Sequence, residues 1–190
     1  MTHDDQAIGR RIVIYGVTGS GKTTLSRQIG AALGLGIVEL DALRHDGGWD
    51  TTPWDQMRAR VVARLAQHPE GWVCEGNYRH VRDTVLSRAD TVVWLRLPWH
   101  LTFTRLLRRT VSRAWSKQPL YAPNGPRESF RDAFLSRGSI LWWAIHQHRA
   151  SIRSVAATIA DLRARIPVHV LRSPADVQRL LRAVEAAGRP

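Results

Sequence analysis

The chain is poor in cysteine and in long apolar runs, and each shortage excludes a class of protein. Cys74 is the single cysteine among 190 residues, which excludes an internal disulfide and predicts a reducing compartment. No apolar run approaches the roughly 20 residues that a membrane span requires, and the polar residues 1–6 do not read as a secretory signal. We therefore expect a cytoplasmic protein with no membrane partner, built as a single domain over residues 1–190.

Lysine is also scarce, because 26 of the 28 basic residues are arginine. The net charge of +12 is unevenly placed: residues 1–100 carry +1, and residues 101–190 carry +11. Such an excess fits a nucleic-acid partner, a highly charged anion such as ATP, or biased composition alone. DNA is therefore a possible partner, but the charge by itself does not favour it.

What the chain does contain is a phosphate-binding motif close to its beginning. Residues 16–23 read Gly-Val-Thr-Gly-Ser-Gly-Lys-Thr, which matches the P-loop pattern G-x-x-x-x-G-K-T. The apolar residues 11–15 predict a buried strand entering the loop, and residues 24–33 predict a helix leaving it. Strand, motif and helix occur in the order that a functional P-loop requires, so a chance glycine-rich turn is a poor explanation.

The motif predicts how a nucleotide is bound. Glycines allow successive backbone N–H groups to point at phosphate oxygens, and the helix N-terminus adds partial positive charge. Lys22 is placed to reach the β- and γ-phosphates, and the Thr23 hydroxyl to bind Mg²⁺. We expect ATP with Mg²⁺ as the cofactor, held by Gly16, Val17, Thr18, Gly19, Ser20, Gly21, Lys22, Thr23 and Thr24.

Short apolar strands alternate with helices along the rest of the chain. The predicted strands cover residues 11–15, 37–41, 72–75, 91–95 and 168–171. Helix-start signals, a Ser or Thr cap followed by proline, occur at Thr52-Pro53 and at Ser173-Pro174. This alternation predicts an α/β fold with a parallel sheet covered on both faces, and ligands of such sheets bind at the carboxyl ends of the strands.

Acidic and basic residues follow two of these strands. Asp41 and Arg44 come after the second strand, where they can face the P-loop; a helix-capping Asp beside a solvated Arg is the alternative. Glu75 ends the third strand, where a ligand of Mg²⁺-bound water is expected. Arg79, four residues later, would direct a bidentate guanidinium at a phosphate, unless this segment is only a surface turn.

The middle of the chain predicts a lid over the site. Arg105 and Arg109 lie one helical turn apart on a basic helix, and residues 114–137 contain a Pro/Gly-rich loop. Guanidinium groups and excluded water both assist phosphoryl transfer. We expect Trp49 to contact the substrate, whereas Cys74 and the tryptophans in strands and helices, including Trp142, are expected in the core.

These residues together resemble the nucleoside-monophosphate kinases, a group of P-loop proteins. Asp41-Ala42-Leu43-Arg44 is similar to Asp-Met-Leu-Arg of the adenylate kinases, and residues 75–79, Glu-Gly-Asn-Tyr-Arg, are similar to their Asp-Gly-Phe-Pro-Arg. The chain resembles still more the adenylate-kinase-related topology modulation proteins. The shared stretches are Leu-Asp-Ala-Leu with a following Gly-Trp, Gly-Asn-Tyr, Ala-Asp-Thr-Val and Val-Leu-Arg-Ser.

The resemblance implies a three-layer fold with strand order 2-3-1-4-5, a short lid, and phosphoryl transfer from ATP to a small acceptor, first of all a nucleoside monophosphate. It implies that Asp41, Arg44, Trp49 and Arg79 bind the acceptor. It also implies that Lys22, Asp41, Arg105 and Arg109 act in catalysis, the two last arginines closing over ATP. The alternatives are a small-metabolite kinase of the gluconate or shikimate type and a nucleotide-dependent DNA-binding regulator.

Overall fold

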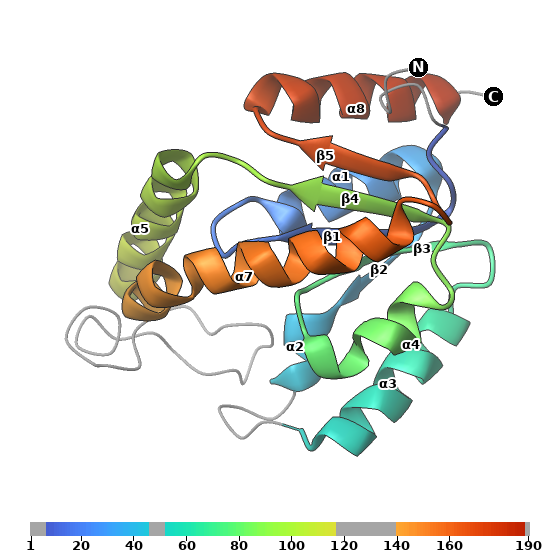
Figure 1. Cartoon of the computed structure of the whole chain (residues 1–190), viewed down its shortest axis with the longest axis horizontal. Helices are drawn as coiled ribbons and strands as arrows, with labels where there is room; N and C mark the ends of the chain where they lie inside the picture. The colour runs from blue at the N-terminus through green and yellow to red at the C-terminus, as the bar shows by residue number, and fades with distance from the viewer. Residues whose placement is uncertain (1–6, 46–51, 117–139, 189–190) are drawn as a thin grey trace.

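The computed structural model describes residues 7–45, 52–116 and 140–188. Within the described residues, five strands form one sheet, and each pair of neighbouring strands is parallel (Figure 1). The strands are β1 (Arg11–Gly16), β2 (Gly36–Glu39), β3 (Trp72–Glu75), β4 (Thr91–Leu95) and β5 (Val168–Leu171). Their order is β2-β3-β1-β4-β5, which confirms the predicted topology.

Helices cover both faces of the sheet, as the alternation predicts. α1 (Lys22–Leu33) and α8 (Pro174–Ala187) pack on one face, through a cluster that includes Ile29 and Val184. The other face carries α3 (Trp54–Ala66), the 3-10 turn η2 (Arg79–Val81), α4 (Arg82–Leu86) and α7 (Ile140–Leu162). α2 (Leu40–Arg44) and α5 (Trp99–Ser116) lie at the edge where the strands end (Figure 1).

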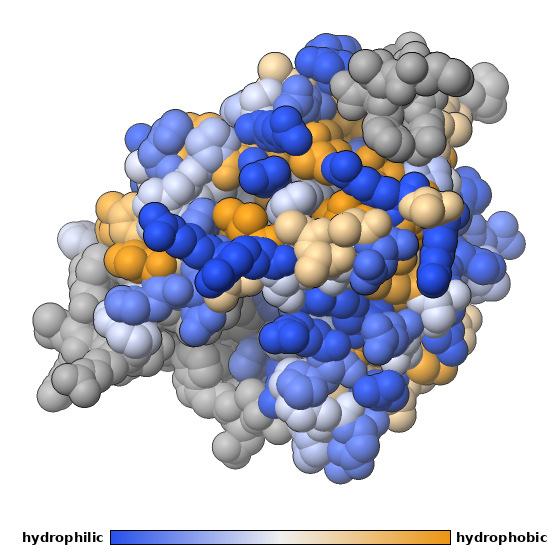
Figure 2. Space-filling model, in the orientation of Figure 1, coloured by the Kyte–Doolittle hydropathy of each residue, from blue (hydrophilic) through white to orange (hydrophobic). Residues whose placement is uncertain are grey.

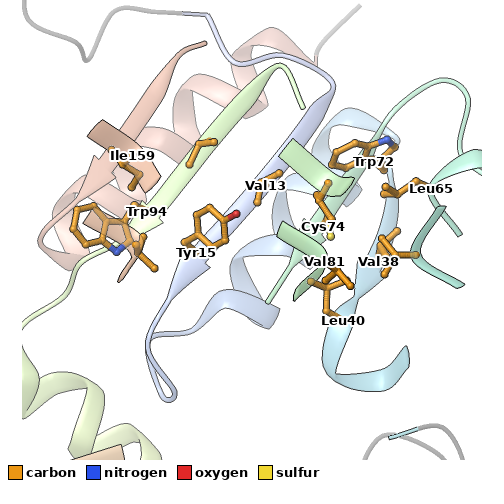
Figure 3. Close-up of a cluster of buried hydrophobic side chains, with 14 of the residues drawn as sticks. Val13, Tyr15, Val38, Leu40, Leu65, Trp72, Cys74, Val81, Trp94 and Ile159 are labelled. Carbon is orange, nitrogen blue, oxygen red and sulfur yellow. The ribbon is translucent and has the colours of Figure 1, made fainter. Parts of the chain in front are cut away.

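β1 shows why this sequence forms a central strand. Ile12 and Ile14 pack into the cluster beneath α1 and α8, whereas Val13 and Tyr15 enter the opposite cluster. All four are 0–3% exposed, and strands of this kind are apolar throughout because both faces are covered. Figure 3 shows Val13 and Tyr15 beside Cys74 and Trp94. Burial raises the pKa of the Cys74 thiol well above its ordinary value, as expected for a core residue.

α8 begins at the second predicted start signal, with a complete capping box. The Ser173 hydroxyl accepts a hydrogen bond from the backbone N–H of Asp176 at 3.2 Å, and the Asp176 carboxylate accepts one from the Ser173 N–H at 2.9 Å. Pro174 occupies the first turn. These contacts satisfy backbone donors that a helix start leaves unpaired.

Three local predictions were wrong. Leu40 and Asp41 belong to α2, since β2 already ends at Glu39. Thr52 is not the cap of α3, because Pro53 takes that position and the Thr52 hydroxyl instead accepts a hydrogen bond from Arg60. Trp142 is 46% exposed and stacks on His146 one turn along α7, with ring centroids 3.9 Å apart. No helix in the described ranges has the length and apolar character needed to cross a membrane.

Candidate functional site

The P-loop has the backbone geometry of a phosphate cradle. Gly19 and Gly21 adopt φ values of 81° and 95°, a region that residues with a Cβ rarely occupy. A side chain on Gly19 would also meet the carbonyl oxygen of Thr102 on α5. The Ser20 hydroxyl is buried and has no hydrogen-bond partner among the described residues. The loop therefore offers an unused polar group where a phosphate oxygen is expected.

Lys22 starts α1 and turns back over the loop. Its ammonium donates to the carbonyl oxygens of Gly16 at 2.9 Å and Val17 at 3.3 Å. Burial lowers the pKa of Lys22, against the opposing attraction of Glu75 and Asp41, while Arg109 lowers it further. Asp41 and Arg109 thus act on the P-loop lysine electrostatically, although they come from α2 and α5.

Thr23 and Glu75 form the oxygen-rich side of the site. The Thr23 hydroxyl donates to Glu75 Oε1 at 2.7 Å, and Glu75 is 3% exposed at the end of β3. Burial raises the pKa of Glu75, although Lys22 and the hydrogen bond from Thr23 oppose that rise. A hydroxyl and a carboxylate are the ligand types that Mg²⁺ and its bound waters take, so this pair fits the predicted ion.

Asn77 is a site residue that the sequence reading missed. Its amide brackets one residue of the P-loop: Nδ2 donates to the Gly16 carbonyl at 2.7 Å, and Oδ1 accepts from the Gly16 N–H at 3.3 Å. The Gly-Asn pair had indicated only a turn. Nothing in the sequence relates Asn77 to Gly16, because β1 and β3 meet only in the sheet.

Arg105 lies beside the P-loop, as predicted. Its Nη1 would be 3.9 Å from a Cβ placed on Gly21, and it lines a pocket of about 280 Å³, which we call the donor pocket. The donor pocket is lined by Ser20, Gly21, Thr24, Leu25, Gln28, Leu95, Arg105, Pro174, Val177 and Gln178. It opens from the P-loop toward the start of α8, a contribution that sequence reasoning did not foresee.

The predicted acceptor residues are placed less uniformly. Asp41 occupies the first turn of α2, directly after β2. The Arg44 guanidinium stacks over Trp54 at 3.9 Å from the ring centroid, and its buried Nη1 has no partner among the described residues. Arg79 is exposed and lines a groove against α7. Trp49 and residues 117–137 of the predicted lid lie outside the described residues.

Comparison with known proteins found kinases that are similar in sequence or in fold. No family model matches the chain. A shikimate kinase from Paramagnetospirillum magneticum is 32% identical over an alignment of length 134, and the match covers 64% of this chain and 66% of the length of that relative.

Two solved structures share the fold along almost the whole chain. A gluconokinase from Sinorhizobium meliloti superposes with a TM-score of 0.53 at 19% identity, covering 96% of this chain and 93% of its own. A sugar kinase from a Janibacter species gives a TM-score of 0.52 at 19% identity, covering 94% and 96%. The narrower resemblance to topology modulation proteins stays a prediction. The five-stranded parallel sheet in the order 2-3-1-4-5 therefore belongs to a fold that this chain shares with both of these kinase structures.

Proposed function

We propose that the protein transfers a phosphoryl group from ATP, in a Mg²⁺-dependent reaction, to a hydroxyl group of a small acceptor. The observation that carries the proposal is the joining of Lys22, Thr23, Glu75 and Asp41 at one edge of the sheet. The Thr23 hydroxyl donates a hydrogen bond to Glu75. Glu75 and Asp41 both raise the pKa of Lys22, and Lys22 and Asp41 act in opposite directions on the pKa of Glu75. No other part of the described chain combines a phosphate cradle with carboxylates.

On the donor side, each residue has a separate task. The N–H groups of the P-loop and the ammonium of Lys22 bind the β- and γ-phosphates, and Ser20 supplies its unused hydroxyl. Thr23 and Glu75 are the residues that would hold Mg²⁺, Glu75 through bound water, and the ion would supply charge neutralisation for the transferred phosphoryl group. Arg105 covers the nucleotide at the donor pocket, and Arg109 lies within electrostatic reach of Lys22.

On the acceptor side, Asp41 is the candidate general base. A hydroxyl acceptor loses a proton as its oxygen attacks phosphorus, and a carboxylate in reach takes that proton. Asp41 affects the pKa values of both Lys22 and Glu75, which supports a position next to the phosphoryl group. The likeness to a shikimate kinase supports a hydroxylated acceptor as well.

A nucleoside monophosphate is the second candidate acceptor. Arg44 and Arg79 form no ion pair within the described residues, and two uncompensated guanidinium groups suit a phosphate. Their placement gives this candidate less support, because Arg44 stacks on Trp54 and Arg79 lines the groove against α7. A phosphate acceptor brings no proton, so Asp41 would have no proton to accept and no role as a general base.

The test begins with an ATP-consumption screen, detected by product, over hydroxylated metabolites and nucleoside monophosphates. With the acceptor found, kcat is measured against pH for wild type, Asp41→Asn and the control Asp55→Asn, an exposed aspartate in the first turn of α3. We expect Asp41→Asn to lower kcat at least about 100-fold and to remove the acidic limb of the profile, with the control unchanged.

A small loss of kcat with the acidic limb intact would contradict the base assignment and favour the phosphate acceptor. Lys22→Ala serves as the check on the donor side, because removing its charge should abolish turnover while the fold remains. Turnover at the wild-type rate in folded Lys22→Ala would overturn the proposed function as a whole.

A further inference from the structure

We propose that the groove between α7 and the η2–α4 segment is a second binding site for oxyanions, one that takes a phosphate or diphosphate group of a small molecule. We call it the arginine groove. It has a volume of about 490 Å³ and is lined by Arg79, Arg82, Ala150, Arg153, Ser154, Ala157, Thr158 and Asp161. It shares no residue with the donor pocket, and it does not depend on the proposed transfer reaction.

Arg82 forms the fixed base of the arginine groove. Its Nη1 donates to the Thr158 hydroxyl at 2.6 Å and its Nη2 to the Ser154 hydroxyl at 3.2 Å, both across the gap to α7. Its guanidinium also lies 5.7 Å from the centroid of the Tyr15 ring. The Arg82 Nε is buried with no partner among the described residues. A half-buried arginine held by neutral hydroxyls keeps its full charge available to a ligand.

The charge of the groove is not compensated by the protein. Arg79 and Arg153 are exposed on its two sides, and neither forms an ion pair within the part of the chain that is described. Asp161 is the single acid in the lining and lies almost one helical turn beyond Thr158. Three arginines against one aspartate leave two positive charges, and buried or concave charge of one sign attracts a counter-ion of the other.

The shape of the groove favours a small molecule. Residues 150, 153, 154, 157, 158 and 161 recur at helical spacing on one stripe of α7, and two of them are alanines that leave room. The volume lies in the range of small-ligand sites. Figure 2 shows strongly hydrophilic residues mixed with apolar ones on the face that carries α7 and α4. Arg79, which lines the groove, follows the last residue of β3 by four positions and is also one of the predicted acceptor residues.

The test measures pyrophosphate binding by titration calorimetry on full-length protein. Saturation with a non-hydrolysable ATP analogue occupies the P-loop, and Lys22→Ala, titrated without nucleotide, gives an independent arm with a disabled P-loop. Arg153→Gln and Thr158→Val probe the groove, and Arg163→Gln, an exposed arginine on the same part of the chain but outside the groove, is the matched control. Thermal unfolding checks that each variant is folded.

We expect nucleotide-saturated wild type to bind pyrophosphate, Arg153→Gln to weaken binding about tenfold or more, and Arg163→Gln to change it less than about twofold. Equal affinity in Arg153→Gln and wild type would overturn the site, and so would loss of binding when the P-loop is occupied. Binding of a short DNA duplex that depends on Arg153, without any binding of pyrophosphate, would replace the small molecule by a nucleic acid.

A further arm separates two sources of the phosphate. If pyrophosphate raises the KM of the acceptor found by the screen and leaves kcat unchanged, the groove holds a distal group of that acceptor. If it leaves that KM unchanged, the groove binds a separate molecule. These two results separate the sources once Arg153-dependent binding of pyrophosphate has been measured, and the Asp41→Asn experiment can fail without affecting that binding.

Discussion

At the scale of single residues, Glu75 lies in a buried position that disfavours the ionised form of its carboxyl group. Burial raises its pKa above the ordinary value of 4.5, so the folded protein binds a proton at this site more tightly than the unfolded chain does. The stability that this gives is complete below pH 4.5 and is lost as pH rises through the folded pKa. Glu75 therefore lowers the stability of the fold as pH rises from acid toward neutral.

This predicts opposite effects of Glu75→Gln on stability and activity. The free energy of unfolding of the variant, relative to wild type, should increase as pH rises from about 4 to 7, while Mg²⁺-dependent turnover falls about 10–100-fold. Urea unfolding at several pH values and kcat measured against Mg²⁺ concentration test both parts. Glu70→Gln, on an exposed turn, is the control, and an unchanged stability difference across this pH range would contradict the argument.

Asn77 predicts a second residue-scale effect, on nucleotide affinity. In Asn77→Asp one carboxylate oxygen still accepts from the Gly16 N–H, but the other faces the Gly16 carbonyl oxygen that the amide now donates to. Two acceptors in contact repel, so we expect ATP to bind about tenfold more weakly than to wild type, and more weakly than to Asn77→Ala. Calorimetric titration with ATP checks this order. Wild-type affinity in Asn77→Asp would show that the two hydrogen bonds between Asn77 and Gly16 do not determine the shape of the loop.

At the scale of elements, α5 presents arginines with different roles. Arg105 reaches the P-loop and the donor pocket, whereas Arg108, three residues on, is exposed and lines no described pocket. We expect Arg105→Ala to weaken ATP binding about tenfold and Arg108→Ala to change it less than about twofold. Competition with a fluorescent ATP analogue measures both, and equal losses would indicate that only the net charge of α5 matters.

The elements that could be predicted from sequence are those whose signals are local. β1, β3, β4 and β5 are short apolar runs, and α8 has its cap and proline within four residues. The start of α2 was missed because Leu40 is apolar and fits a strand equally well. In the structure Leu40 is the first residue of α2, and its side chain packs against Gly76. A Cβ added to Gly76 would lie 2.8 Å from the Leu40 side chain.

The site was predicted in the same uneven way. Lys22, Thr23 and Glu75 follow from a motif and a strand end, and the structure brings them together. The contacts of Asn77 with Gly16, of Arg44 with Trp54, and of Pro174 with the donor pocket each join segments distant in the chain. The packing of the sheet and its helices determines these contacts, so no local sequence pattern predicts them.

At the scale of the whole molecule, the order of the strands brings the site residues together around the P-loop. Because β1 lies between β3 and β4, the P-loop has the end of β3 on one side and the segment leading to α5 on the other. Glu75 and Asn77 come from the first neighbour, and Arg105 from the second. The excess positive charge of residues 101–190 thus includes arginines at two separate places, the donor pocket and the arginine groove.

The hydrogen bonds of Lys22 to the P-loop carbonyls compete with the phosphates of a nucleotide for the same ammonium. An incoming phosphate competes with two hydrogen bonds that the ammonium already makes to the loop carbonyls. Where it displaces them, its net gain is smaller than the full strength of the new ion pair. A single phosphate gains little net free energy from this exchange. A triphosphate with its metal ion makes further contacts with the loop and gains more. We therefore expect the loop to bind a nucleoside triphosphate in preference to a single inorganic phosphate.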